Sequence, residues 1–76
     1  MTFDFLESYG KRLDSWDGTP MGNRVVAFFI YDNQGQYLGI GFIGGHYISQ
    51  PFDHLPTREE VEKHFETDER FTKHFN

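Results

Sequence analysis

The chain contains no cysteine and only three prolines in 76 residues. Without cysteine, neither a disulfide nor a thiolate metal site can stabilise the fold. A chain of this length predicts one compact domain, residues 1–76, which removes only about 60–65% of its unfolded surface from water and therefore needs a dense core. The lack of cysteine also suits a reducing compartment, so we expect the protein in the cytoplasm.

Basic residues and long hydrophobic runs are scarce as well. Seven Lys and Arg stand against twelve Asp and Glu, and the net charge is −5. Because attraction to phosphates requires clustered cations, we expect no direct binding of nucleic acid. No apolar run approaches the roughly 18–20 residues that span a bilayer, so we expect no membrane association. Residues 1–12 place acids before bases and contain no apolar segment, which argues against a signal peptide.

Aromatic residues are abundant instead, with nine Phe, four Tyr and one Trp. A buried aromatic ring covers about 150–250 Å², so most of these rings are expected in the core. They are nevertheless numerous for so short a chain. We therefore expect some of them at the surface.

Residues 4–16, DFLESYGKRLDSW, predict a helix. Asp4 followed by Glu7 has the spacing of a capping box. The apolar side chains that recur at helical spacing are Leu6, Tyr9, Leu13 and Trp16. Residues 17–23 concentrate Gly, Pro, Asp and Asn and predict a loop.

Residues 24–31 and 36–43 are rich in β-branched and aromatic residues and predict an antiparallel hairpin. The DNQG sequence between them favours a type I turn followed by a left-handed glycine, which pairs Asp32 with Gln36. This register places Val26 opposite Phe42, Phe28 opposite Ile40 and Ile30 opposite Leu38 on one face. The other face then carries Val25, Ala27, Phe29, Tyr31, Tyr37, Gly39, Gly41 and Ile43.

Residues 46–50 predict a third strand that returns after a Gly44-Gly45 turn. The alternative is a bulge at these glycines within a longer second strand. The predicted order is α-β-β-(β)-α. This order indicates a small two-layer α+β domain, in which an antiparallel hairpin or a three-stranded meander packs against N- and C-terminal helices.

Residues 57–75 predict helical structure that begins with Thr57 as N-cap and Glu60 as its capping-box partner. The apolar side chains on one face are Val61, Phe65, Phe71 and Phe75. Asp68 interrupts this face. Either one kinked helix spans the segment, or Thr67 ends a first helix and Asp68 caps a second.

The glycines of YLGIGFIGGHY match the G-x-G-x-x-G spacing of a dinucleotide-binding turn. That turn requires a helix that begins within it. Here Gly39 and Gly41 alternate with apolar residues at strand spacing, and Pro51 follows soon after the third glycine. We therefore expect no cofactor.

No set of side chains predicts catalysis or a metal site. The histidines are His46, His54, His64 and His74. None of them is spaced from another as metal ligands on one helix are, and the most plausible metal-binding pair is His64 with Asp68, one helical turn apart. Ser49 near His46 and Asp53 beside His54 resemble fragments of acid–base pairs, but no nucleophile motif accompanies them. We expect a protein that is not an enzyme and binds no metal.

The predicted second sheet face offers a contact surface. If both helices cover the first face, seven residues around a shallow glycine trough stay exposed: Val25, Phe29, Tyr31, Tyr37, Gly39, Gly41 and Ile43. Exposed apolar patches rich in Tyr and Phe are typical of protein–protein contacts. We expect a small acidic module that binds another protein as inhibitor, adaptor or assembly factor, with a symmetric homodimer as one form of this interaction. In the other arrangement one helix covers each face and nothing stays exposed.

The acidic side of the C-terminal segment suggests an alternative function. Its ridge consists of Glu59, Glu62, Glu66 and Glu69. Such a ridge can mimic nucleic-acid phosphates and block the basic groove of a DNA- or RNA-binding protein. A solvated face is the simpler interpretation, because the expected i, i+4 pairs Glu59–Lys63, Glu66–Arg70 and Glu69–Lys73 would neutralise the ridge.

Overall fold

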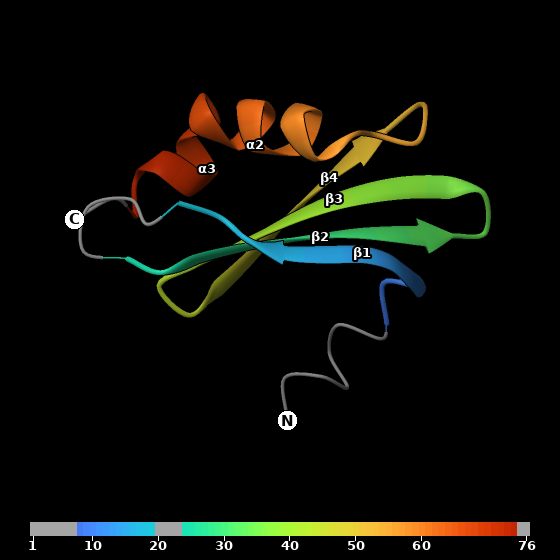
Figure 1. The fold of residues 1–76 in the computed structure, drawn as a ribbon, viewed down its shortest axis with the longest axis horizontal. Coiled ribbons are helices and arrows are strands. Elements are labelled where there is room, and N and C mark those ends of the chain that lie inside the picture. Colours follow the sequence, from blue (N-terminus) through green and yellow to red (C-terminus); the bar gives the residue numbers. More distant parts are fainter. Residues whose placement is uncertain (1–7, 20–23, 75–76) are drawn as a thin grey trace.

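A computed structural model describes residues 8–19 and 24–74. The described elements are strands β1 (Lys11–Asp17), β2 (Val26–Asn33), β3 (Gln36–Ile43) and β4 (His46–Phe52), then helices α2 (Arg58–Glu66) and α3 (Glu69–Thr72). The strands form one antiparallel sheet in the order β1-β2-β3-β4. Figure 1 shows α2 and α3 together on one side of this sheet. The α+β class is thus confirmed, and the expected order of the elements is partly wrong.

The prediction of a helix over residues 4–16 is wrong from Lys11 onward, where β1 pairs with the edge of β2. Residues 4–7 lie outside the described part of the chain. Gly10 has φ 116°, a backbone conformation that no right-handed helix contains. Pairing with β2 also gives the backbone of β1 its hydrogen bonds, while the Trp16 ring packs 5.7 Å from that of Phe28. Tertiary pairing therefore overrides the helical spacing of the apolar residues.

The predicted β2–β3 hairpin is present, but its register is wrong by one residue. Asn33 pairs with Gln36, so the turn contains only Gln34 and Gly35. Both turn residues have positive φ, 55° at Gln34 and 88° at Gly35, as a two-residue type I′ turn requires. The Gly35 N–H donates to Asp32 Oδ1 at 2.8 Å. This geometry follows the twist of the strands better than the expected longer turn does, even though glutamine seldom adopts positive φ.

The corrected register moves the glycine trough to the other side of the sheet. Gly39 lies opposite Ile30 and Gly41 opposite Phe28, on the side that faces the helices. A Cβ built on Gly41 would lie 2.7 Å from the Phe71 ring. The trough is therefore filled by aromatic side chains of this chain.

The structure also decides the remaining expectations, which concern the third strand and the C-terminal helices. Gly44 and Gly45 have φ values of 58° and 85° and form the turn into β4, so the third strand is present and the bulge is not. Thr57 and Glu60 form both hydrogen bonds of the predicted capping box. The C-terminal segment contains two helices, because Asp68 caps α3.

Apolar clusters lie on both sides of the sheet. The cluster beneath the helices contains Val26, Phe28, Ile30, Ile43, Val61, Phe65 and Phe71, with Trp16, Ile48 and Phe52 packed against it. The second cluster consists of buried Tyr31 and Ile40, with Tyr9, Phe29, Leu38 and Tyr47 packed against them. The second cluster lies on the side where Figure 1 places neither α2 nor α3.

Candidate functional site

The sheet face turned away from α2 and α3, here called the distal face, is the candidate functional site. Strand alternation and register assign three rows of residues to it. The first row is Arg12, Tyr31, Leu38 and Pro51; the middle row is Ser15, Phe29, Ile40 and Ser49; the third row is Asp17, Ala27, Phe42 and Tyr47. Most of these side chains are apolar.

Aromatic rings form a continuous strip across the distal face. The Phe29 ring lies 6.4 Å from Tyr31 and 6.3 Å from Tyr47, and the Phe42 ring lies 4.7 Å from Tyr47. Tyr31 is buried, whereas Phe29, Phe42 and Tyr47 are half-buried. The strip thus combines a fixed base with partly accessible rings, which is the composition favoured at protein–protein contacts.

The Tyr31 hydroxyl is an unusual feature of this strip. The residue is only 1% exposed, and its Oη atom has no hydrogen-bond partner among the described residues. Burying an unpaired polar group costs about 1–3 kcal/mol. Because this oxygen is buried, another molecule that docks on the face cannot reach it, and the cost falls on the folded chain itself.

Two opposite charges stand at the two ends of β1 on the distal face. Arg12 belongs to the first row and Asp17 to the third. The Arg12 guanidinium lies 5.9 Å from the centre of the Phe29 ring. Both charged residues are exposed, and neither forms an ion pair within the described part of the chain.

The structure divides the predicted contact residues between the two faces. Phe29 and Tyr31 lie on the distal face, as part of one aromatic strip. The positions that the register places on the helix side are Tyr37, Gly39, Gly41 and Ile43. Val25 precedes β2 and is 71% exposed. The expectation of one aromatic–glycine surface is therefore wrong, because the hairpin register reverses the faces of β3 relative to β2.

Sequence reasoning missed four distal-face residues: Leu38, Ile40, Phe42 and Tyr47. The alternation of large apolar residues with glycine in β3 was visible in the sequence. A two-residue turn at Gln34-Gly35 would have placed that apolar set beside Phe29 and Tyr31. The type of turn therefore decides on which face of the sheet these residues lie.

The acidic ridge of α2 and α3 is only partly available. Glu59, Glu66 and Glu69 are exposed, whereas Glu62 accepts a hydrogen bond from Trp16 Nε1 at 2.6 Å. None of the three expected i, i+4 ion pairs forms among the described residues. A shallow hollow of about 460 Å³ is lined by Thr57, Glu59, Glu60, Glu62, Lys63 and Glu66. The ridge is thus less neutralised than the sequence suggests.

Arg58, the first residue of α2, is held by β1. Its Nε and Nη2 atoms donate to Asp14 at 2.9 and 2.8 Å, and its guanidinium lies 4.9 Å from the centre of the Trp16 ring. The hydrogen bond from Arg58 lowers the pKa of Asp14. This cation therefore fixes the helix to the sheet edge and leaves the ridge acidic.

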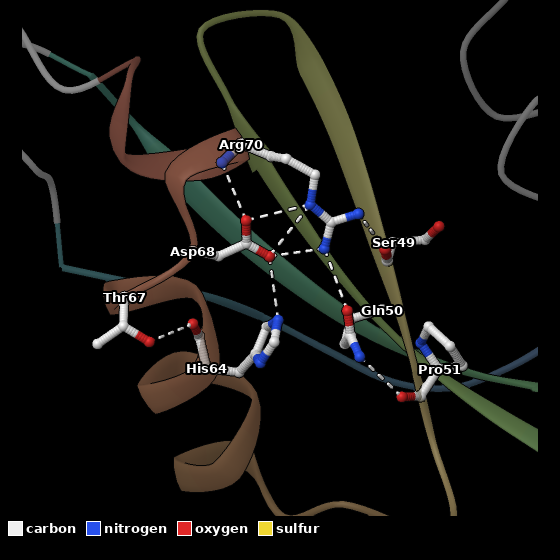
Figure 2. A network of polar contacts seen from close by, with 7 residues as sticks. All are labelled: Ser49, Gln50, Pro51, His64, Thr67, Asp68 and Arg70. Atoms are coloured by element: carbon white, nitrogen blue, oxygen red, sulfur yellow. Dashed lines mark hydrogen bonds and ion pairs between the residues drawn. The ribbon is translucent and has the colours of Figure 1, made fainter.

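Asp68 collects most of the polar contacts at the corner between α2 and α3, as Figure 2 shows. His64 Nε2 lies 3.0 Å from Asp68 Oδ2, and Arg70 Nη2 lies 2.6 Å from the same oxygen. The hydrogen bonds from Arg70 hold the pKa of Asp68 far below its usual range. The pair singled out as the most plausible metal ligands is thus brought together, but a guanidinium occupies the carboxylate.

The structure also shows the positions of the other two candidate acid–base pairs, Asp53 with His54 and Ser49 with His46. His54 Nδ1 lies 2.6 Å from Asp53 Oδ1, and Nε2 lies 3.0 Å from Glu60 Oε2, with the ring at the surface. The hydrogen bond with Asp53 raises the pKa of His54. Ser49 and His46 fall on opposite faces of β4, so they do not form a pair. No group of three or more potential metal ligands converges within residues 8–19 and 24–74.

Neither α2 nor α3 has the length or apolar character needed to cross a membrane, and no other helix among the described residues does.

The candidate functional site is an aromatic sheet face with a charge at each end of its edge strand, and a separate acidic ridge lies on α2 and α3. Comparison of the chain with protein-family models, with curated proteins and with solved structures finds no match.

Proposed function

We propose that this protein is a small acidic, non-enzymatic binding module that docks onto another protein chain through the distal face. The observation that carries the proposal is the aromatic strip of Phe29, Phe42 and Tyr47, which stays half-buried on a sheet face that α2 and α3 do not cover. Contiguous apolar surface of this kind marks interaction sites on small proteins. The module would act in the cytoplasm as an inhibitor, adaptor or assembly factor.

The composition of the distal face supports a protein partner. Tyr and Phe supply large contact area at low entropic cost, and they are enriched at the centres of protein interfaces. A partner that presents apolar side chains to Phe29, Phe42 and Tyr47 would fit this face.

The acidic ridge supports a second candidate function, the mimicry of nucleic-acid phosphates. The observation that favours it is the absence of the neutralising i, i+4 pairs among the described residues, where Arg70 binds Asp68 instead of Glu66. Glu59, Glu66 and Glu69 then present their charge to solvent. The target would be the basic groove of a DNA- or RNA-binding protein.

A photo-crosslinking amino acid at Phe42 tests the two candidates in the native host. If the protein docks through the distal face, the probe at position 42 should form a covalent adduct with a protein. The same probe at Gln34, at the exposed tip of the β2–β3 hairpin, should form none. The same probe at Glu66 reports on the ridge. The adduct expected from position 42 would contain either another protein or a second copy of this chain.

The affinity of the captured complex then separates the two surfaces. Where the partner is a different protein, binding through aromatic contacts changes little between low and high salt, whereas binding through the glutamates weakens steeply. Phe42→Ser should weaken docking through the distal face, and Glu66→Gln should leave it unchanged. If position 42 yields no adduct and Phe42→Ser binds as tightly as the unsubstituted protein, the distal face is not the docking surface.

A further inference from the structure

We propose that the distal face docks onto the same face of a second copy of this chain, forming a symmetric dimer with its twofold axis across the strands. This inference rests on the proposed function and names its partner. A twofold interface brings the same surface of both copies together, so the surface must be complementary to itself. The charges and the apolar rows of the distal face meet this requirement.

The charge pattern selects the direction of the axis. An axis in the plane of the interface and perpendicular to the strands stacks β1 on β1 with opposite direction. The first row then faces the third row, so Arg12 meets Asp17 of the second copy, and the reciprocal pair forms at the other end of the strand. Both side chains are exposed, and neither has an ion-pair partner among the described residues. In the dimer, two intermolecular ion pairs would give each of these charges a partner.

An axis parallel to the strands gives a poorer match. It stacks β1 on β4, where the corresponding rows contain Pro51 and Tyr47. Arg12 would then face Pro51, and Asp17 would face Tyr47. Two charges would be covered by apolar side chains without a partner, which is costly.

The apolar rows agree with the same axis. The half-buried Leu38 side chain would lie over the half-buried Phe42 of the second copy, since these residues occupy equivalent places in the first and third rows. The half-buried Phe29 of the middle row would meet its own counterpart near the axis. Apolar residues at the centre are a feature of well-packed interfaces.

The available area permits a dimer of modest stability. Four strands of seven or eight residues form a face of about 25 by 19 Å, from a rise of about 3.3 Å per residue and a strand spacing of about 4.8 Å. Two such faces bury roughly 1,000 Å² or more, near the lower limit for a specific interface. Because the interface is small, the two ion pairs should contribute visibly to its stability.

Sedimentation equilibrium of the full chain at low salt tests the proposal by charge reversal. We expect the unsubstituted protein to dimerise reversibly with concentration. Arg12→Asp and Asp17→Arg should each weaken the dimer by at least about 10-fold, because each turns two attractions into two repulsions. The double variant, which carries both changes, should restore most of the affinity.

Lys11→Asp is the matched control. It makes the same change of charge on the same edge strand, one position from Arg12, and should leave the dimer nearly unchanged. Circular dichroism melting of each variant confirms that it is folded before its sedimentation is interpreted.

Three results would overturn the dimer: an unsubstituted protein that stays monomeric at high concentration, single variants that dimerise normally, or a double variant that is no better than the single ones. A monomer whose Phe42 crosslinks to a different protein would overturn the dimer and retain the proposed function. A monomer whose distal face captures nothing would overturn both.

Discussion

Single residues decide how closely the helices approach the sheet. Gly39 and Gly41 leave room for side chains of the helix-side cluster, since a Cβ on Gly39 would lie 2.7 Å from the Phe52 ring and 3.3 Å from Val61. At Gly41 the Phe71 and Phe65 rings would lie 2.7 and 3.3 Å from the added atom. The glycines thus act through close packing within the core, and this explains their alternation with apolar residues.

Gly41→Ala should destabilise the protein by about 1–3 kcal/mol, because the added methyl group forces the two buried rings to move. The midpoint and slope of urea unfolding measure this loss. Ser15→Ala, at an exposed strand position on the distal face, serves as the control and should change the midpoint little. An unchanged midpoint for Gly41→Ala would mean that the Phe71 ring withdraws without cost and that the trough is not tightly packed.

At the scale of elements, Asp68 and Arg70 together connect the two helices to β4. Asp68 caps α3 by accepting a hydrogen bond from Arg70 N at 2.9 Å, and it also contacts His64 of α2. The Arg70 side chain extends to β4, where its guanidinium donates to Ser49 O at 3.3 Å and to Gln50 Oε1 at 3.1 Å. Figure 2 shows this chain of contacts from helix to strand.

The lowered pKa of Asp68 predicts a specific dependence of stability on pH. The ionised carboxylate contributes stability above its ordinary pKa of 3.8, and this contribution is lost as pH falls below that value toward the lower pKa of the folded state. Asp68→Asn should therefore lower stability by about 1–3 kcal/mol at neutral pH and flatten the loss of stability in acid. Unfolding free energies measured by urea across the acid range give both quantities.

Glu69→Gln is the control for this prediction, because it removes an exposed carboxylate from the next residue. It should leave the acid dependence unchanged. An Asp68→Asn variant with the same acid dependence as the unsubstituted protein would show that the α2–α3 corner does not depend on the ionised carboxylate.

How well the sequence predicts an element depends on whether its signal is local. The capping box of Thr57 and Glu60, the Gly44-Gly45 turn and the cap at Asp68 depend on residues a few positions apart, and each expected feature is present. The assignment of β1 depends on the edge of β2, which no local pattern contains. The register depends on Gln34 at φ 55°, which the intrinsic preferences of glutamine disfavour.

The same reasoning explains the outcome for the candidate site. A shift of one residue between β2 and β3 exchanges the faces, so a single turn type determined whether the predicted contact residues lay together. The existence of an apolar sheet face opposite the helices could be expected from the sequence. The residues on it required the three-dimensional pairing.

For the whole molecule, the two sides of the sheet differ in how completely their aromatic side chains are buried. Phe28 and Phe65 beneath the helices are 1% and 0% exposed, and their rings stack with 6.2 Å between centres. On the distal face Tyr31 and Ile40 are buried, but Phe29, Leu38, Phe42 and Tyr47 are only half-buried. The helix side therefore provides the main stabilising core, and the distal face retains area for contact.

Phe65→Ala should cost about 3–5 kcal/mol, a large share of the total stability of a small domain, and should leave the protein largely unfolded at 37 °C. Phe29→Ala removes the same side chain from the distal face and should cost much less. Thermal melting followed by circular dichroism compares the two. Equal losses would mean that the distal face is as fully closed as the core, and this would count against docking there.

The strand order β1-β2-β3-β4 also bears on how the chain reaches this structure. Each strand pairs with its neighbour in the sequence, and two of the three connections contain only two residues. Closing such short loops costs little entropy, so the sheet can grow from the β2–β3 hairpin outward without waiting for distant segments to meet. Docking of α2 and α3 onto the glycines would then be the later step, and fast folding of this kind leaves the helix-side cluster exposed to other nascent chains only briefly.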